Sequence, residues 1–159
     1  MLGLGALGLE RWSVWSCELK RAGGGEPSYW IDTLREARAR ADGGLRFLIG
    51  ADQASAFHRW RDPREILALA RPVVIPRGGV GSPAALVESM APSEAWSARE
   101  LDAWASWFVQ TPEIDVSATA IRAALGDRAR RERPIDHLDA NVHAYILRHG
   151  LYLDGSADD

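Results

Sequence analysis

Two short apolar runs, separated by a segment with a helical pattern, constrain the fold of this chain more than any other feature. LRFLIG covers residues 45–50 and PVVIP covers residues 72–76. Apolar runs of this kind are typical of strands that are covered on both faces. Pro63 can open a helix between them, because proline is favoured at the first helical position. Strand, crossover helix and second strand form a parallel pair. The sequence therefore predicts an α/β fold, a Rossmann-like parallel sheet with helices on both faces.

Weaker patterns predict the other elements of the first two thirds of the chain. WSVWSCEL, residues 12–19, alternates β-prone residues and predicts a further strand. Ser28 is a candidate cap for a helix over residues 29–41, and Asp52 is a candidate cap for a short helix after LRFLIG. Residues 78–98 are rich in Gly, Pro, Ser and Ala and predict irregular structure with one short helix. SWFV, residues 106–109, predicts a strand that follows a helical turn.

Two helices are predicted near the end of the chain. Ser117 can cap the first of them and Asp139 can cap the second, which has Gly150 at the position of a C-terminal glycine. A chain of 159 residues is long enough for one domain with a real core. We expect a single domain over residues 1–153 and a disordered tail over residues 154–159.

Composition limits the class of protein. The hydrophobic fraction is 47%, the charged fraction is 26% and the net charge is −3, which is ordinary for a globular protein and argues against one that coats nucleic acid. Cys17 is the single cysteine, so it cannot form an intramolecular disulfide, and we expect it to be buried. MLGLGALGLE is too short to span a membrane and lacks the positive leader of a signal peptide. We expect a cytoplasmic protein with no nucleic-acid or membrane partner.

The carboxyl end of the LRFLIG strand is a candidate ligand site, because ligands of open parallel sheets bind there. Gly50 lets the backbone approach a ligand, and Asp52 is placed to accept hydrogen bonds from ribose hydroxyls. The alternative is a tight turn with Asp52 as a helix cap. The residues alone leave both interpretations open.

Two neighbouring stretches have a functional and a structural interpretation. In FHRWRDP, Trp60 could stack on an aromatic ring while Arg59 or Arg61 meets an acid group. The structural alternative is a partly buried tryptophan between solvated arginines. PRGGVGS, residues 76–82, lacks both the dinucleotide fingerprint and the lysine of a phosphate loop, so we expect a flexible connector there.

DVSATAIR gathers Ser117, Thr119 and Arg122 at the predicted start of a helix. Unpaired backbone N–H groups, two hydroxyls and a guanidinium can converge there on a phosphate. The alternative is that Ser117 is a helix cap and nothing more. The four histidines show no metal-ligand spacing, so we expect no protein metal site, and no residue stands out as a nucleophile.

Taken together, these stretches resemble bacterial nicotinate-nucleotide adenylyltransferases. The matching order is ELKRAGGGEPSYWIDTL, FLIGADQASAFHRWRDP, VVIPR, DVSATAIRAAL and VHAYILRHGLY, from about Glu18 to Tyr152. The resemblance implies a nucleotidyltransferase fold and transfer of the AMP part of ATP to nicotinate mononucleotide. The mononucleotide phosphate would attack the α-phosphorus of ATP in line, and pyrophosphate would leave with the Mg²⁺ that ATP carries.

The resemblance also implies roles for individual residues. Ser117, Thr119 and Arg122 would hold the ATP phosphates, and Trp60 would stack on the nicotinate ring. Tyr29 and Trp30 match the dipeptide whose second residue binds the nicotinate carboxylate; threonine is commoner at position 30, and tryptophan offers only its backbone N–H there. The remaining residues in the implied sites are Gly50, Ala51 and Asp52 for the nucleotide and ribose, and Arg77 for nicotinate mononucleotide.

One family segment has no match among these 159 residues. It is a loop of the form GGxFDPxHxGH after a first strand, whose histidines stabilise the transition state, so no catalytic residue is assigned. We interpret the chain as N-terminally truncated, either a fragment or a product of an internal start. We then expect an unpaired sheet edge, exposed apolar surface, association into homo-oligomers and poor activity of the chain alone.

Three alternatives to this assignment follow from the same residues. A related adenylyltransferase could act on nicotinamide mononucleotide or pantetheine phosphate. A non-catalytic remnant could bind nucleotide without turnover. A structural fragment would bind neither substrate.

Overall fold

The computed structural model describes residues 1–23, 27–112 and 116–153. The chain forms two compact units, which we describe separately. The sheet unit is Cys17–Glu113, and the terminal unit is Met1–Ser16 together with Ile114–Asp159. The expected single domain over residues 1–153 stays a prediction, and the expected tail over residues 154–159 lies outside the described residues.

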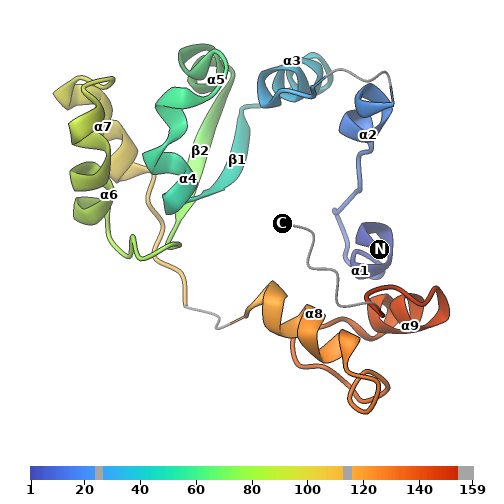
Figure 1. The fold of residues 1–159 in the computed structure, drawn as a ribbon. Helices are drawn as coiled ribbons and strands as arrows, with labels where there is room; N and C mark the ends of the chain where they lie inside the picture. Colours follow the sequence, from blue (N-terminus) through green and yellow to red (C-terminus); the bar gives the residue numbers. More distant parts are fainter. Residues whose placement is uncertain (24–26, 113–115, 154–159) are drawn as a thin grey trace. The chain divides into compact units, whose positions relative to one another are not determined.

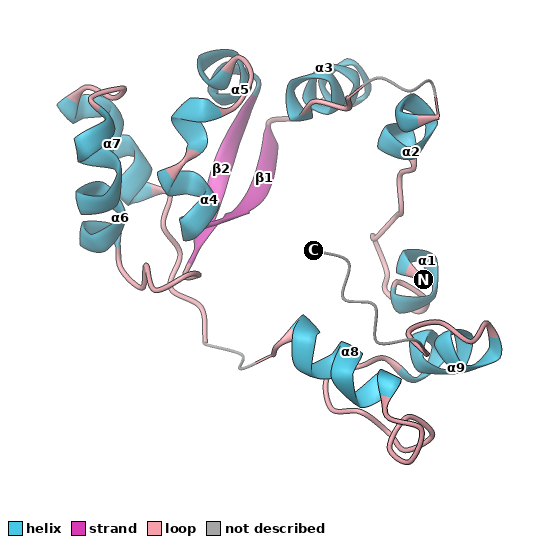
Figure 2. Cartoon of the chain, viewed as in Figure 1, coloured by secondary structure: helices cyan, strands magenta, loops and turns pink. Residues whose placement is uncertain are grey.

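The sheet unit is built on two parallel strands, β1 (Leu45–Gly50) and β2 (Ala70–Ile75) (Figure 1). Their register pairs Leu45 with Ala70 and Gly50 with Ile75. The connection between them contains α4 (Ala51–Ser55), the 3₁₀ turn η1 (Phe57–Arg59) and α5 (Pro63–Leu69). Figure 2 shows helices around this sheet. The protein therefore has the predicted α/β fold, with a parallel sheet in which a helical crossover joins the two strands.

Further helices of the sheet unit precede and follow the strands. They are α2 (Cys17–Ala22), α3 (Trp30–Arg40), α6 (Pro83–Met90), the 3₁₀ turn η2 (Ala91–Ser93) and α7 (Ala98–Ser106). Ser82 caps α6, since its side chain accepts a hydrogen bond from the Ala85 N–H. Ser97 and Glu100 form a reciprocal capping box at the start of α7. One of these helices lies in residues 78–98, as predicted.

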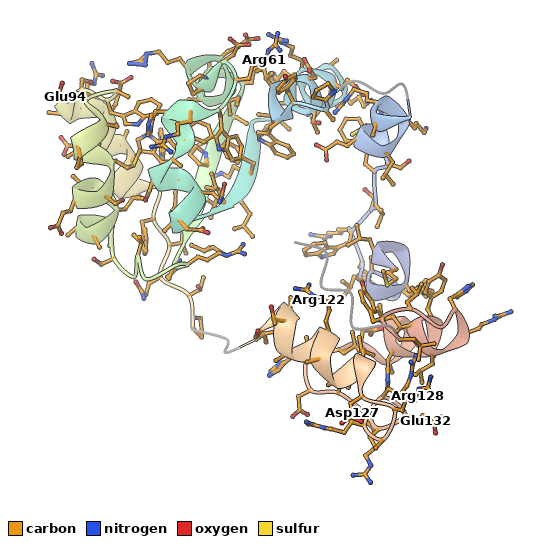
Figure 3. All side chains as sticks on the ribbon, in the orientation of Figure 1. Arg61, Glu94, Arg122, Asp127, Arg128 and Glu132 are labelled. Atoms are coloured by element: carbon orange, nitrogen blue, oxygen red, sulfur yellow. The ribbon has the colours of Figure 1, made fainter. Side chains whose placement is uncertain are left out.

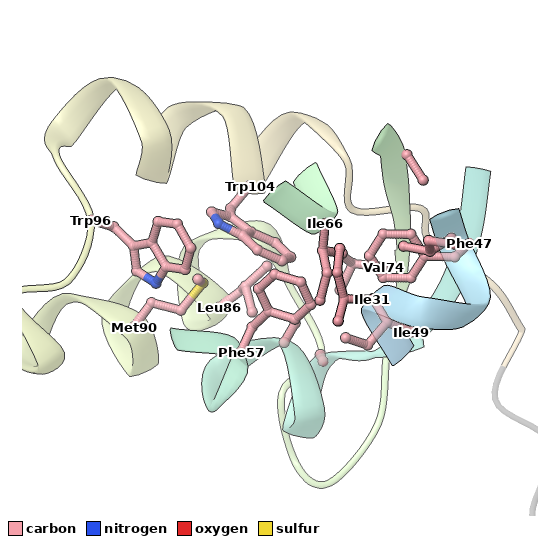
Figure 4. Packing of buried hydrophobic residues seen from close by; sticks show 14 residues of the cluster. Ile31, Phe47, Ile49, Phe57, Ile66, Val74, Leu86, Met90, Trp96 and Trp104 are labelled. Carbon is pink, nitrogen blue, oxygen red and sulfur yellow. The ribbon is translucent and has the colours of Figure 1, made fainter. Parts of the chain in front are cut away.

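A core rich in aromatic side chains holds the sheet unit together (Figure 4). Phe57 and Trp104 are fully buried, with ring centroids 5.1 Å apart in an edge-to-face arrangement. Trp96 packs on Trp104 at 5.8 Å, and Phe47 of β1 stacks on Phe57 at 6.1 Å. The core therefore joins α7 through the η1 segment to the inner face of the sheet.

The outer face of the sheet is open within this unit. Phe47 and Ile49 are buried, whereas Leu48 between them is 68% exposed. The expectation that LRFLIG is covered on both faces is therefore wrong, because no described element of the sheet unit packs over Leu48. β2 is the one neighbour of β1 in the described sheet. The expected unpaired edge and exposed apolar side chain are present in this unit.

The segment predicted as a strand over residues 12–19 is a second correction. The described sheet consists of β1 and β2 and does not include this segment, and Cys17–Ala22 is the helix α2. Glu18 in the first turn and Lys20 and Arg21 in the last turn complement the helix dipole. A strand needs a ladder partner, which an alternating pattern cannot guarantee. Cys17 is buried, as expected.

Both predicted caps near the sheet are also wrong. Ser28 does not cap α3; its hydroxyl accepts a hydrogen bond from Nε of Arg21 at 3.2 Å, and Tyr29 is the N-cap residue. Gly50, not Asp52, is the N-cap residue of α4. Asp52 lies one residue inside the first turn, where a negative charge still favours the helix.

The strand predicted at SWFV is reduced to one bridge. Residues up to Ser106 belong to α7, so the helical part is longer than predicted. Phe108 forms a parallel bridge with Val74, and the Val109 N–H donates to the Val74 carbonyl at 2.8 Å. The extended segment after α7 thus lies beside β2 for only one ladder position.

The terminal unit contains α1 (Leu2–Gly5), α8 (Ala118–Gly126) and α9 (Ala140–Arg148). Both predicted caps are confirmed: Ser117 accepts from the Ala120 N–H, and Asp139 accepts from two backbone N–H groups of α9. Gly150 has a positive φ of 61° just beyond α9, as a C-terminal glycine requires. None of the residues in α1 is buried.

Charged side chains lie on the surfaces of both units. Figure 3 labels Arg61 and Glu94 on the sheet unit, and Arg122, Asp127, Arg128 and Glu132 on the terminal unit, all of them exposed. Within the described ranges, the chain forms no helix with the length and apolar character that crossing a membrane requires.

The capping box of α7 predicts a pH-dependent stability. Hydrogen bonds from the Ser97 backbone and side chain lower the pKa of Glu100. A lowered folded-state pKa gives stability that is present above the unfolded value of about 4.3 and is lost as pH falls through the folded value. We expect Glu100→Gln to lower the free energy of unfolding at pH 7, with a smaller loss at pH 3. Urea denaturation at the two pH values measures this difference.

Ser82 supplies the matched control, because its cap has no carboxylate partner in the described contacts. Ser82→Ala should lower the free energy of unfolding by about 1 kcal/mol at both pH values. A Glu100→Gln loss that stays constant from pH 7 to pH 3 would contradict the assignment of the ionised carboxylate to the cap.

Candidate functional site

The carboxyl ends of β1 and β2 bring Asp52 and Arg77 together. Because Gly50 pairs with Ile75, the two chains leave the sheet side by side. Nε of Arg77 lies 3.8 Å from Oδ2 of Asp52, and the Arg77 side chain is 69% exposed. This pair is a long ion pair with an exposed partner, so it contributes little stability by itself. It does place a guanidinium and a carboxylate at the edge of the sheet where ligands bind.

Two glycines make this close approach feasible. A Cβ on Gly50 would lie 2.5 Å from Oδ1 of Asp52 and 2.7 Å from Cδ of Arg77. A Cβ on Gly78 would lie 2.7 Å from the Cβ of Asp52. The absence of side chains at both positions therefore lets the backbone of both loops pack directly against Asp52.

Gly78 also has a conformation that favours glycine. Its φ is 63° and that of Gly79 is 81°, and the Val80 N–H donates to the Arg77 carbonyl at 3.2 Å. Positive φ at both central residues is the mark of a type I′ turn. The stretch expected to be a flexible connector is thus a hydrogen-bonded two-glycine turn that positions Arg77 beside Asp52.

Asp52 has one carboxylate oxygen without a partner. Oδ1 is buried and accepts no hydrogen bond from any described residue. Oδ1 lies against the backbone of Gly50, whereas Oδ2 lies beside Arg77, and the Asp52 side chain is 32% exposed. Ala51 beside it is fully buried, so neither its side chain nor its backbone is exposed to a ligand in this structure. The predicted ribose-binding role of Gly50, Ala51 and Asp52 stays a prediction.

The aromatic residues of the predicted nicotinate site lie on one side of the core. The Trp60 ring packs on Phe57 with ring centroids 4.9 Å apart and is half-buried. The Trp30 ring meets Phe47 at 6.0 Å in an edge-on arrangement, and its indole N–H is buried without a described partner. Tyr29 is 38% exposed, and the guanidinium carbon of Arg61 lies 4.5 Å from the centre of its ring.

The structure therefore separates the two residues of the predicted carboxylate-binding dipeptide. Tyr29 is at the surface, whereas the Trp30 side chain belongs to the core. Trp30 is the first residue of α3, and the first N–H groups of a helix have no partner within the helix. The inference that Trp30 offers only its backbone agrees with this packing, and the binding role itself stays a prediction.

The predicted phosphate-binding residues lie on α8 in the terminal unit. Ser117 Oγ accepts from the Ala120 N–H at 3.2 Å, so Ser117 is a cap in this structure. Nη2 of Arg122 lies 3.4 Å from Oγ1 of Thr119, and both side chains are exposed. The structure places these three residues in the first two turns of one helix, counted from its N-cap. Because they lie in a different unit, their position relative to Asp52 is not described.

A pocket of about 370 Å³ opens beside the same helix. Its lining includes Ser117 but neither Thr119 nor Arg122. Four charged or titratable side chains, those of Arg130, Arg133, Asp136 and His137, also line it. The pocket is thus on the side of α8 that Ser117, Ala120 and Ile121 face, and it does not contain the predicted phosphate-binding pair.

Comparison with known proteins identifies relatives of the chain. No protein-family model matches it. A probable nicotinate-nucleotide adenylyltransferase of Chromobacterium violaceum is 38% identical over 145 aligned positions, which cover 85% of this chain and 64% of that protein. Proteins with the same name are 31% identical in Dehalococcoides mccartyi, covering 69% of that protein, and 33% identical in Frankia casuarinae, covering 73%.

The chain belongs to the nicotinate-nucleotide adenylyltransferase family. The resemblance inferred from the motifs is confirmed. The chain spans 64 to 73% of the length of these three relatives, while 85 to 98% of its own length is covered.

The sequence did not predict two features of the candidate site. Gly78 was assigned to a connector, although it packs on Asp52; the signal was the double glycine of RGGV, which is typical of a type I′ turn. The contact of Arg61 with Tyr29 had no signal in the sequence, because the residues are far apart in the chain. Among the described residues, no cluster of three or more His, Cys, Asp or Glu could hold a metal ion.

The contact of Gly78 with Asp52 predicts a difference between two adjacent glycines. Gly78→Ala and Gly79→Ala should each lower the free energy of unfolding by about 1 kcal/mol through backbone strain, because alanine is strained at positive φ. Gly78→Ala should cost more, since a Cβ on Gly79 would meet nothing within 4 Å. Urea denaturation of both variants measures the difference. Equal losses of stability would mean that Asp52 does not pack on Gly78.

Proposed function

We propose that this chain supplies the nucleotide- and nicotinate-binding parts of an enzyme that transfers AMP from ATP to nicotinate mononucleotide. The products would be deamido-NAD and pyrophosphate. The observation that carries the proposal is the packing of Asp52 between Gly50 and Gly78, with its carboxylate beside Arg77 at the carboxyl ends of the two strands. Family membership supports it, because the relatives carry the name of that activity.

The proposed reaction requires positioning more than covalent chemistry. The phosphate of nicotinate mononucleotide would attack the α-phosphorus of ATP, and pyrophosphate would leave with the Mg²⁺ that ATP carries. Such transfers depend on orientation and on neutralising the charge of the phosphates. Thr119 and Arg122 offer a hydroxyl and a guanidinium for this purpose, and the first N–H groups of α8 add the positive end of a helix dipole.

Asp52 and the aromatic residues would bind the sugar and the base. Oδ2 of Asp52, on a side chain that is 32% exposed, would accept a hydrogen bond from a ribose hydroxyl. Trp60 would stack on the pyridine ring with the face that is turned away from Phe57. Arg77, largely exposed beside Asp52, would contact the phosphate of the mononucleotide.

A second candidate function, for the 159-residue chain assayed by itself, is nucleotide binding without turnover. These 159 residues contain no GGxFDPxHxGH segment. The family resemblance implies that the histidines of that segment stabilise the transition state. Removing one such group can slow the reaction about 10²–10³-fold. The candidate residues for binding are present, whereas those implied for catalysis are not.

The proposed function predicts a difference between turnover and binding. We expect the 159-residue chain to release little or no pyrophosphate from nicotinate mononucleotide, ATP and Mg²⁺, because the transition-state groups are missing. We expect the same chain to bind ATP in isothermal titration calorimetry. The control reaction omits the mononucleotide. Prompt pyrophosphate release would favour the catalytic function and overturn the assigned importance of the histidine segment.

Substrate choice is tested in the same calorimetric series. Nicotinamide mononucleotide and pantetheine phosphate take the place of nicotinate mononucleotide, each at the same concentration. We expect nicotinate mononucleotide to bind more tightly than pantetheine phosphate, because Trp60 offers a face to a pyridine ring. Tighter binding of pantetheine phosphate would point to the sister reaction.

Arg122 and Arg128 form a matched pair for the phosphate site, since both are exposed in the terminal unit. Arg122→Gln should weaken ATP binding about tenfold, the effect of losing one charge-assisted contact. Arg128→Gln should leave ATP binding unchanged. Nicotinate mononucleotide binding should be the same in both variants. If both substitutions weaken ATP binding equally, Arg122 acts only through the net charge of the chain and not through a contact with the phosphates.

A further inference from the structure

The strongest unassigned feature of the sheet unit is the guanidinium of Arg61, which lies over the ring of Tyr29. The distance from its central carbon to the ring centre is 4.5 Å, within the range of a cation–π contact. Arg61 directly follows Trp60, and Tyr29 directly precedes Trp30. The contact therefore joins the two segments that carry the proposed nicotinate-binding aromatic residues. Figure 3 shows Arg61 at the surface of the sheet unit.

The Trp30 side chain is not available to recognise an acid group. It packs against the core cluster and meets Phe47 edge-on at 6.0 Å. Its indole nitrogen is a donor, but it is buried and no described residue accepts from it. In a chain with tryptophan at this position, a side chain that distinguishes a carboxylate from an amide must come from elsewhere in the site.

Arg61 is free to make such a contact. Its described ion pair is with Asp62, where Nε and Oδ2 are 3.8 Å apart and the two side chains are 59% and 50% exposed. An exposed pair at that distance contributes little and exchanges readily. No other described residue forms an ion pair or hydrogen bond with this guanidinium. Stacking on Tyr29 restricts its orientation, which lowers the entropy that binding a ligand would cost.

Tyr29 is itself held in place from both sides. Ser28 before it accepts a hydrogen bond from Arg21, whose guanidinium also bonds to Thr33 and Glu36 of α3. Tyr29 is the N-cap residue of α3 and makes no side-chain cap contact. The Asp32 N–H donates to the Tyr29 carbonyl at 3.1 Å, so the ring that carries Arg61 belongs to the residue at which α3 begins. Backbone donors and a guanidinium are both suited to a carboxylate.

We propose that Arg61, positioned by the ring of Tyr29, is the residue that selects a pyridine carboxylate over a pyridine carboxamide in this chain. The proposal rests on the proposed function, because it names the specificity residue of that same site. A guanidinium can donate two parallel hydrogen bonds to a carboxylate, whereas an amide carries no charge and presents one acceptor oxygen. The same contact is therefore stronger with nicotinate mononucleotide than with nicotinamide mononucleotide.

Calorimetric binding of the two mononucleotides to the 159-residue chain tests this inference. We expect the chain to bind nicotinate mononucleotide about tenfold or more tightly than nicotinamide mononucleotide, the effect of one charge-assisted contact. Arg61→Gln should remove most of that preference, because it weakens the binding of nicotinate mononucleotide and leaves the affinity for nicotinamide mononucleotide unchanged. Arg99→Gln is the matched control, since Arg99 is an exposed arginine of α7 in the same unit and should keep the full preference.

Two further variants separate orientation from charge. Tyr29→Phe keeps the ring and should keep the preference, whereas Tyr29→Leu removes the ring and should reduce it. Arg61→Lys keeps the charge without the planar fork and should retain only part of the preference. The melting temperature of each variant shows whether it is folded, and Arg61 and Tyr29 are exposed enough that folding should survive.

The failures of the two proposals give different results. If the unmodified chain prefers the acid and Arg61→Gln prefers it equally, the role of Arg61 is overturned while the proposed function stands. Equal affinity of the unmodified chain for both mononucleotides also overturns the role of Arg61. If neither mononucleotide binds the unmodified chain, the proposed nicotinate site fails, and the specificity residue with it.

Discussion

The parallel register of β1 and β2 is the constraint on which the proposed site depends. It pairs Gly50 with Ile75, so the segments that leave the two strands run side by side. Asp52 then meets both the Arg77 side chain and the backbone of Gly78. A shift of the register by one residue would also turn Phe47 and Ile49 away from the core, because side chains alternate along a strand. The same apolar pattern that buries one face of the sheet therefore fixes the geometry at its edge.

The proposed nicotinate residues are anchored through their neighbours. Trp30 is fixed in the core by Phe47, and Phe47 stacks on Phe57, which in turn contacts Trp60. This chain of ring contacts connects the start of α3 to the end of η1. Tyr29 and Arg61, each next to one of these tryptophans, are thereby kept at the surface and within reach of one another. Replacing a small polar residue by tryptophan at position 30 would thus exchange a ligand contact for a packing contact.

Local signals made much of the fold predictable from the sequence. The apolar runs of both strands, Pro63 at the start of α5 and the caps Ser117 and Asp139 all act through residues close to them in the chain. Predictions that depend on distant partners were less successful. Residues 12–19 alternate like a strand but have no described ladder partner, and Leu48 is exposed because coverage of a sheet face depends on other elements.

The candidate site follows the same division. Gly50 and Asp52 could be singled out because they follow a strand directly. The packing of Gly78 on Asp52 and of Arg61 on Tyr29 joins positions that only the folded chain brings together. Family motifs filled part of this gap for Ser117, Thr119 and Arg122, which lie in the first two turns of α8, counted from its N-cap.

The aromatic core has a spectroscopic consequence. Five of the seven tryptophans lie in the sheet unit, at positions 30, 60, 96, 104 and 107, and pack in or against its core. The other two, Trp12 and Trp15, are exposed near the start of the chain, and residues 116–153 contain none. Blue-shifted tryptophan emission would therefore report on the sheet unit alone, whereas the circular dichroism of helices reports on both units. Comparing the two signals during unfolding would show whether the units melt together or in sequence.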